Sequence, residues 1–282
     1  MRKRKALGGT LTIGLWLICL VIPATGQAKI RCQRNADGSV LSVSATGATF
    51  AGVRRAGEGI KVFDLIERNR TCMTDATVTT TDLIKVFASK GASVTVELVG
   101  GPFAPGLTAE EDLSSEIELE ASGPGYVEVV GGNGHDHFRY MNDGSESGLN
   151  LNPDEDEDLD FAVAPEWRKD MLFVADGGDG PDLIDALGSP ALEMFAGGGN
   201  GNDTLVAPPT GAILEGERGS DRLIGGPAFD YAIPGKGADR VMSRGGSDLI
   251  EMKPDGSRDR IDCGPGHDEV ARGDRFDRLR SC

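Results

Sequence analysis

Aromatic side chains are scarce in this chain: they make up 5% of its 282 residues, whereas glycine is abundant, with 41 residues. An ordinary protein contains about 7% glycine, roughly half of this share. Few aromatics and many glycines argue against a conventional core of large packed side chains. The glycines do not recur at every third residue, which excludes collagen. Short apolar runs throughout the chain argue against wholesale disorder.

Basic residues are also in short supply, with 29 against 45 acidic ones and a net charge of −16. Residues 1–28 hold four of the basic residues and no acidic one, so the remainder carries −20. Such a field repels nucleic acid and anionic membranes and attracts cations. The composition therefore predicts no nucleic-acid partner.

A long apolar run occurs only near the start of the chain. Basic residues at 2–5 precede an apolar stretch at 11–22 and small residues at 23–28. This order is typical of a signal peptide, and the alternative, a retained membrane anchor, would need about 20 apolar residues. We expect residues 1–28 to be removed, leaving a secreted, extracellular protein without a membrane span.

Cysteines are few and lie near the two ends of the remaining chain. They are Cys32, Cys72, Cys263 and Cys282. An even number in an exported chain indicates disulfides, and four cysteines allow three pairings. The positions favour Cys32–Cys72 and Cys263–Cys282. A zinc site is the alternative, but the close C-x2-C spacing that zinc sites often use is absent.

A nine-residue repeat is the strongest pattern. The template G-G-x-G-x-D-x-U-x, in which U is a large apolar residue, is matched in full at 131–139, 177–185 and 198–206. Weaker copies follow in phase, and their sixth-position aspartates recur every nine residues from Asp221 to Asp248. After a two-residue insertion the phase resumes at Asp259. Three full matches in one chain indicate a repeat architecture.

The spacing predicts coils of two repeats each, with six-residue turns and three-residue strands. Glycines allow positive φ and expose backbone carbonyls, and aspartate adds an anionic oxygen, so the turns suit Ca²⁺, which takes 6–8 oxygen ligands. Turns 18 residues apart should stack, as in Asp203 with Asp221, Asp221 with Asp239, and Asp230 with Asp248. The residues expected at calcium are Gly131, Asn133, Asp136, Gly177, Asp179, Asp182, Gly198, Asn200, Asp203, Gly216, Asp221, Asp230, Asp239 and Asp248. The competing interpretation is that these turns are purely structural, because Asp bonds its own backbone in many turns.

These repeats resemble those of the RTX, or haemolysin-type, calcium-binding proteins, and the tail at 259–282 resembles secreted actinobacterial members of that group. The resemblance implies a parallel β-roll with Ca²⁺ at its Gly-rich turns. Several copies depart from the template: Glu217 replaces the second glycine of its copy, Pro234 the first, and Ser243-Arg244 the first two. The N-terminal signal also differs from the C-terminal one of the familiar toxins.

The expected fold class is all-β: a parallel β-roll, or β-solenoid, of nonapeptide repeats with an N-terminal β cap or small β domain. The expected organisation is a signal peptide at 1–28, an N-terminal β region at 29–112, and a β-roll at 113–282 with an acidic insertion at 141–170. Strands are expected at 40–43, 59–63, 77–86 and 94–98.

Catalytic signatures are missing. The chain has three histidines, none of them in residues 29–120, and no G-x-S-x-G, H-E-x-x-H, P-loop or dinucleotide motif. We therefore expect no enzyme, but a calcium-binding structural or interaction module that folds with Ca²⁺, with any partner at the cell surface or in the extracellular matrix. The alternative is an exported hydrolase whose catalytic part is the N-terminal region. Its candidate carboxylates are Glu110, Glu111, Asp112, Glu116, Glu118 and Glu120.

Overall fold

The computed structural model describes residues 29–66, 71–72, 75–81, 83–99, 118–122, 125–142, 147–151, 161–163, 172–189, 193–271 and 273–282. Within these ranges every regular element is a β-strand, which confirms the predicted all-β class. None of these residues forms a helix long and apolar enough to cross a membrane. The predicted signal peptide, the acidic run at 154–158 and the carboxylates at 110–116 lie outside the described residues.

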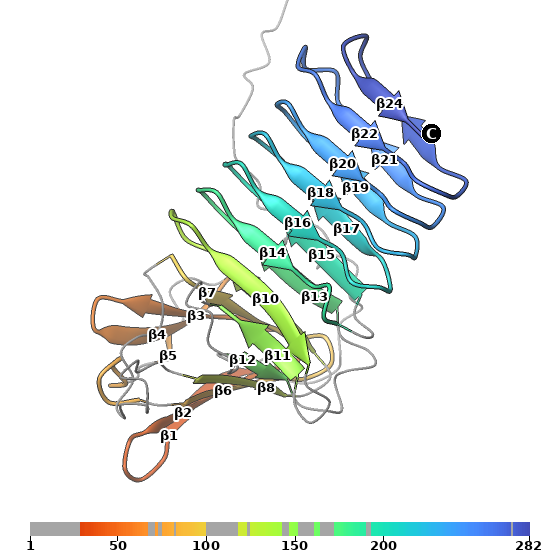
Figure 1. The fold of residues 1–282 in the computed structure, drawn as a ribbon. Helices are drawn as coiled ribbons and strands as arrows, with labels where there is room; N and C mark the ends of the chain where they lie inside the picture. The colour runs from red at the N-terminus through yellow and green to blue at the C-terminus, as the bar shows by residue number, and fades with distance from the viewer. Residues whose placement is uncertain are drawn as a thin grey trace, which may run out of the picture.

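The strands form two long sheets (Figure 1). Sheet A contains, in spatial order, β1 (Lys29–Arg34), β2 (Val40–Thr46), β6 (Leu83–Ala88), β8 (Glu118–Ser122), β12 (Phe161–Val163), β11 (Ser147–Asn150), β10 (His137–Asn142), β14 (Leu183–Asp185), β16 (Thr204–Val206), β18 (Arg222–Ile224), β20 (Arg240–Met242), β22 (Arg260–Asp262) and β24 (Arg278–Arg280). Sheet B contains β23 (Glu269–Ala271), β21 (Leu249–Glu251), β19 (Tyr231–Ile233), β17 (Ala212–Glu215), β15 (Glu193–Gly197), β13 (Leu172–Asp176), β9 (Tyr126–Val130), β7 (Ser93–Glu97), β3 (Phe50–Ala56), β4 (Gly59–Asp64) and β5 (Thr71–Cys72).

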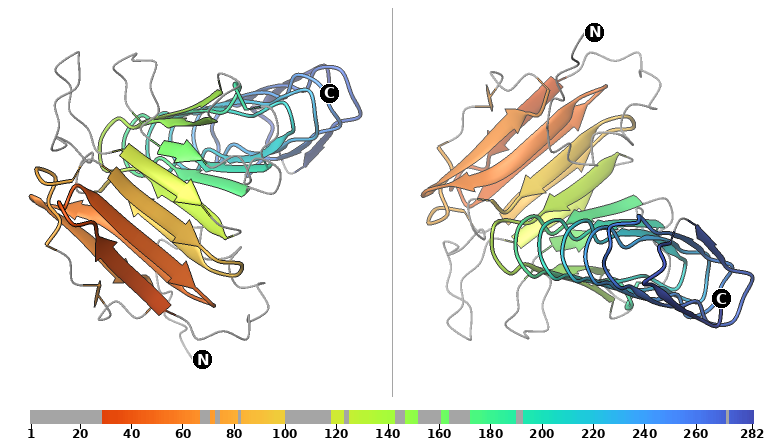
Figure 2. Two further views of the ribbon diagram at one scale, coloured as in Figure 1. Left: turned by 90° about the horizontal axis from the view of Figure 1, so that it is seen from below. Right: turned by 90° about the horizontal axis from the view of Figure 1, so that it is seen from above.

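From β13 onwards the chain alternates between the sheets, one strand in each per coil, and each strand pairs in parallel with the strand one coil away. Leu205, for example, is in register with Leu223, which in turn is in register with Val241. In Figure 2 the coils overlap as a narrow tube, with the N-terminal strands at one end. This is the predicted β-roll, and its regular part repeats every 18 residues, as in Asp203 and Asp221.

The core of the roll is one side chain thick on each sheet, as the repeat predicts. Leu223, Val241 and Ile261 point inward from sheet A, and Ile250 does so from sheet B, all with 2% exposure or less. Leu279 occupies the same position in the last strand but is 54% exposed. The inward position of the repeat is therefore not buried at Leu279, because β24 is the outermost strand of sheet A.

The N-terminal strands belong to the same two sheets as the roll. Parallel pairing connects β2 to β6 and β6 to β8 in sheet A. It likewise connects β3, β7, β9 and β13 in sheet B. Antiparallel strands cover the start of the stack, with β1 on β2 and β4 on β3. The predicted N-terminal β cap is thus built from wider coils that are continuous with the narrow ones.

One strand prediction needs correction. Residues 77–86 do not form one strand, because Thr77 makes only an isolated bridge and a turn precedes β6. In β7, residues on both faces of the strand are buried. Its Val94 and Val96 are buried, but so is Thr95, which donates a 2.8 Å hydrogen bond from Oγ1 to Glu128. The acidic insertion at 141–170 contains β11 and β12.

Disulfides close both ends of the stack, in the predicted pairing Cys32–Cys72 and Cys263–Cys282. Cys32 lies on β1 and Cys72 on β5, the outermost strands of sheets A and B at the N-terminal end. Cys263 is fully buried and directly follows β22, and Cys282 lies just after β24. Since the edges of a sheet are where strands fray or recruit other chains, each bridge stabilises an exposed end. Two disulfides also indicate an oxidising environment.

Candidate cation-binding turns

The repeat aspartates form two rows along the edges of the roll. The turns that lead from sheet B to sheet A carry the long row, which consists of Asp136, Asp182, Asp203, Asp221, Asp239, Asp259 and Asp277. The turns that lead from sheet A to sheet B carry the short row, Asp230, Asp248 and Asp268. Each row runs parallel to the axis of the stack because successive turns lie above one another.

Within each row, one carboxylate oxygen fixes the register of neighbouring coils. The Oδ1 atom of Asp221 accepts a 2.9 Å hydrogen bond from the backbone N–H of Asp203. The same contact joins Asp221 to Asp239 and Asp230 to Asp248, so all three predicted stacks are confirmed. The contact also pairs Asp182 with Asp203 across 21 residues, and Asp136 with Asp182 across 46.

The second oxygen, Oδ2, separates seven of these ten aspartates into two groups. In five of them it is buried without a hydrogen-bond partner, and the residues are only 1–3% exposed: Asp182, Asp203, Asp221, Asp239 and Asp248. In Asp136 and Asp230 the Oδ2 atom accepts a 2.7 Å hydrogen bond from the N–H of Gly132 and Gly226, respectively. A buried carboxylate oxygen without a donor is costly, so the first group calls for a partner that the polypeptide does not supply.

The backbone at the second position of the turn explains this division. In the five turns of the first group that residue has positive φ, as in Gly199 at 92°. Gly132 and Gly226 do not have positive φ, and their N–H groups reach Oδ2. Glu217 and Arg244 keep positive φ, at 65° and 66°, without being glycine. This conformation costs about 1–2 kcal/mol in such residues, so the turn geometry is retained even where the glycine is lost.

In the turns of Asp182, Asp203 and Asp221 the first position is a glycine for a different reason, which is space. A Cβ placed on Gly177 would lie 2.5 Å from Oδ2 of Asp182 and 2.7 Å from the carbonyl oxygen of Gly198. A Cβ on Gly198 would lie 2.5 Å from Oδ2 of Asp203. The carbonyl oxygens of Gly177, Gly198 and Gly216 accept no hydrogen bond from any residue that the structure describes. Carboxylate and carbonyl oxygens therefore converge in these turns, without donors.

Electrostatics at the long row favours a positively charged partner. Burial, reinforced by neighbouring carboxylates, raises the pKa of Asp221 to about 8 and those of Asp182 and Asp239 to about 7. Burial likewise raises the pKa of Asp203 to about 6. Desolvation disfavours the charged form of a carboxyl, so near neutral pH Asp221 mostly holds a proton, and Asp182 and Asp239 partly do, unless a cation replaces it.

Side chains alone do not complete such a site. Among the described residues no three His, Cys, Asp or Glu side chains gather in a way that could hold a metal ion. A cation in these turns would therefore depend on backbone carbonyls as well as the aspartates. This donor set consists only of oxygen, which suits Ca²⁺. The orphaned Oδ2 atoms and the tight first-position glycines thus fit the calcium site that the sequence predicts.

The third-position side chains lie elsewhere. Asn133, Asp179 and Asn200 are exposed, and Nδ2 of Asn200 donates a 2.7 Å hydrogen bond to Oδ1 of Asp179. These side chains are thus on the outer surface of the turns, whereas the orphaned Oδ2 atoms are buried. A role for the three residues in calcium binding stays a prediction.

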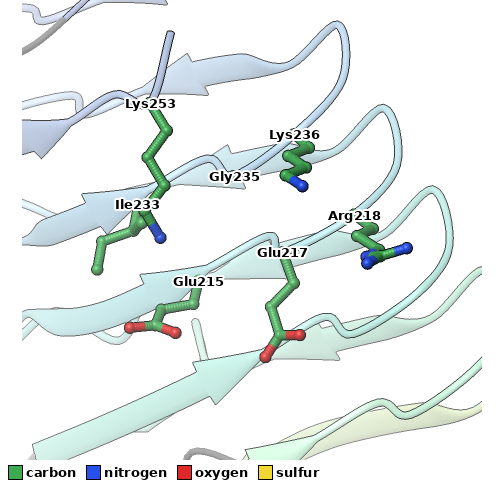
Figure 3. Close-up of a pocket in the computed structure, with 7 residues that line it drawn as sticks. All are labelled: Glu215, Glu217, Arg218, Ile233, Gly235, Lys236 and Lys253. Carbon is green, nitrogen blue, oxygen red and sulfur yellow. The ribbon is translucent and has the colours of Figure 1, made fainter. Parts of the chain in front are cut away.

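A shallow depression lies beside the long row, on the outer side of sheet B (Figure 3). It is lined by Glu215, Glu217, Arg218, Ile233, Gly235, Lys236 and Lys253. Burial raises the pKa values of Glu215 and Glu217, and the charge of Lys253 opposes this shift. The depression contains acidic and basic side chains together, so it lacks the single-signed character of the aspartate rows.

The carboxylates of the hydrolase alternative are mostly outside the described residues. Glu120 is described; it lies on β8 and forms a 2.5 Å ion pair with Lys85 on β6. Both side chains are more than 40% exposed. An exposed ion pair of this kind is common on protein surfaces, and it gives Glu120 no catalytic partner. The prediction that the chain is not an enzyme remains untested.

No family model, curated protein or solved structure matches this chain. Its function must therefore follow from its own geometry. The distinctive feature of that geometry is the set of five buried, donor-free carboxylate oxygens on the edges of a parallel β-roll.

Proposed function

We propose that this protein is a secreted calcium-binding β-roll of the RTX type, which folds around its ions and acts as a structural or interaction module outside the cell. The observation that carries the proposal is the row of orphaned Oδ2 atoms at Asp182, Asp203, Asp221 and Asp239. Each would contribute a carboxylate ligand, and the adjacent glycine carbonyls would contribute others. Asp248 would do the same in the short row.

The chemistry of the turns favours calcium over other biological cations. Zinc prefers nitrogen and sulfur ligands, and the four cysteines of the described residues are bound in disulfides. Magnesium requires near-ideal octahedral geometry and usually keeps several waters, whereas calcium accepts 6–8 oxygens in flexible arrangements. Buried turns that offer carboxylate and carbonyl oxygens therefore match calcium best.

The proposed location rests on two independent features. Residues 1–28 have the order of a signal peptide, and the two disulfides require an oxidising compartment. Extracellular calcium modules bind their ion with dissociation constants of about 0.1–1 mM. At 1 mM calcium, a site with a dissociation constant of about 0.1 mM adds about 1.4 kcal/mol of stability. With several such sites, the roll would gain most of its stability only after export, where it meets millimolar calcium.

Circular dichroism and calorimetry of the chain test the proposal. After treatment with a chelator, the β signal and the unfolding temperature should fall, and added CaCl₂ should restore both. The same concentration of MgCl₂ should restore much less, because Mg²⁺ is poorly suited to these turns. A spectrum and an unfolding temperature that chelator leaves unchanged would refute calcium-dependent folding.

A further inference from the structure

Four arginines form a stripe on the outer face of sheet A. Arg222, Arg240, Arg260 and Arg278 occupy the first position of β18, β20, β22 and β24, and the strand register aligns each with the next. Figure 1 shows these strands side by side along the C-terminal half of the roll. Neighbouring strands lie about 4.8 Å apart, so the stripe is a straight, evenly spaced line of positive charge. We call these four residues the arginine stripe.

The arginines of the stripe are exposed and unpaired. Their backbone N–H groups bond to the neighbouring coil, but none of their guanidinium groups forms a hydrogen bond or an ion pair with another residue that the structure describes. The nearby acidic residue Asp262 is instead 3.8 Å from Arg280, the last residue of β24. Like charges on neighbouring strands destabilise a sheet, and this chain has few basic residues in total. Their alignment is therefore unfavourable for the fold itself.

Neutralising the buried aspartates does not explain the stripe. Each of these arginines directly follows an aspartate of the long row, as Arg222 follows Asp221. However, the charges that act on the carboxyl of Asp221 are those of Asp239, Asp203 and Glu217, and they raise its pKa. No arginine of the stripe is among them. The side chains of the stripe are exposed on the outer face of sheet A.

A groove runs across the same face. It is lined by Arg240, Val241, Arg260, Ile261, Asp262, Arg278, Leu279 and Arg280. Four of the eight lining residues are arginines, three of them from the stripe, and Asp262 is the single acidic residue in the lining. The groove is thus an open, strongly basic surface on a protein that is otherwise strongly acidic.

We propose that the arginine stripe binds an acidic polysaccharide, a linear glycan whose carboxylate or sulfate groups follow the line of arginines. The planar guanidinium group binds such oxyanions through two parallel hydrogen bonds. An extended chain laid along the roll can meet one arginine per strand without bending. This surface requires only stacked coils, so it does not depend on which cation occupies the turns.

Duplex DNA fits the stripe less well. Each of its strands carries one phosphate per 3.4 Å of helix axis, whereas the arginines recur about every 4.8 Å. The negative charge of the remaining surface would also repel a polyanion as wide as a duplex. A thin glycan chain avoids that surface because it contacts only the stripe and the groove.

Binding of a size-defined heparin oligosaccharide, measured by calorimetry at low salt with calcium present, tests this proposal. The double variant R240Q/R260Q removes two central arginines, and R31Q/R139Q removes the same charge from exposed positions on β1 and β10. We expect about tenfold weaker binding by R240Q/R260Q, since two exposed charge pairs are lost and each contributes a factor of about three. The control variant should lose less than about threefold. R240K/R260K keeps the charge without the forked donors and should fall between the two.

Two further ligands define the chemistry that is recognised. Desulfated heparin retains its carboxylates, so binding to it would assign recognition to those groups, and binding only to the sulfated form would assign it to sulfate. Neutral dextran should not bind. The proposal is overturned if heparin does not bind, if both double variants lose affinity equally, or if duplex DNA or phosphatidylserine vesicles bind the stripe more tightly. Calcium-dependent unfolding temperatures of the same variants should match the wild type, which separates this test from that of the proposed function.

Discussion

Replacing Asp221 by asparagine should stabilise the cation-free protein and destabilise the calcium-bound one. The side chain of Asp221 is 2% exposed, its Oδ1 is bonded to the N–H of Asp203, and its Oδ2 has no partner. Asparagine has the same shape and can keep the Oδ1 contact. It removes the negative charge that is unfavourable without a cation and that we propose is required with one.

The magnitude follows from the pKa of Asp221. Burial raises it from 3.8 to about 8, so the folded state holds a proton that the unfolded state releases. Because its folded pKa is the higher one, this group destabilises the cation-free fold increasingly as the pH rises from about 4 to 8, by on the order of 5 kcal/mol at pH 8. Burying the amide of asparagine costs about 1–3 kcal/mol in return. A net gain of about 2–4 kcal/mol remains.

In calcium the sign reverses. Asp221 stacks between Asp203 and Asp239 and so borders two turns. Two sites with dissociation constants of about 0.1 mM add about 3 kcal/mol at 1 mM calcium, and D221N should lose most of this. For a domain of this size each kcal/mol shifts the unfolding temperature by about 2–4 °C. The variant should therefore unfold several degrees above the wild type in chelator and several degrees below it in calcium.

Differential scanning calorimetry at pH 8, with chelator or with 1 mM calcium, measures this inversion. Asp136→Asn is the matched control, because Oδ2 of Asp136 already accepts a hydrogen bond from Gly132. D136N should shift the unfolding temperature in the same direction in both media. If D221N lowers the unfolding temperature in chelator as well as in calcium, the buried charge is not what calcium offsets, and the reasoning is refuted.

Three other outcomes are expected. The rise in unfolding temperature that calcium causes should be larger at pH 8 than at pH 5, with protons released on binding, because protons compete at carboxyls with pKa values of about 6–8; equal rises would contradict this. Asp203→Ala should reduce bound calcium, counted by equilibrium dialysis, more than Asp277→Ala, whose Oδ2 already accepts a 2.6 Å hydrogen bond from Asp274. Cys282→Ser should increase hydrogen exchange in the last coils but leave calcium binding at Asp203 intact, since the Cys263–Cys282 bridge closes only that end.

The nine-residue phase was sufficient to predict the regular part of the roll. It placed Asp203, Asp221 and Asp239 in one stack, and it kept Asp239 aligned with Asp259 across the two-residue insertion. The inward apolar position followed from the same phase. A repeat specifies its own contacts because every coil meets only its neighbours, so the spacing alone is enough.

Where the spacing between repeats changes, the sequence was not enough to predict which aspartates pair. Asp136 pairs with Asp182 across 46 residues and Asp182 with Asp203 across 21, because coil length varies while the turn geometry persists. The wide N-terminal coils have no nonapeptide at all, since their alternating strands carry the pairing instead. The difference between Asp221 and Asp230 depends on φ at the second position of each turn. Gly132 and Gly199 occupy this same position, yet only Gly199 has positive φ, so the residue type does not predict the backbone conformation.

The most direct test of calcium binding is a crystal structure grown in calcium, with anomalous scattering recorded at a wavelength that reveals the ion. The account predicts peaks beside the Oδ2 atoms of Asp182, Asp203, Asp221 and Asp239, within about 2.3–2.6 Å of those oxygens and of glycine carbonyls. It predicts no peak of similar height at Asp136. Turns at Asp203 and Asp221 that hold only water at saturating calcium would contradict it.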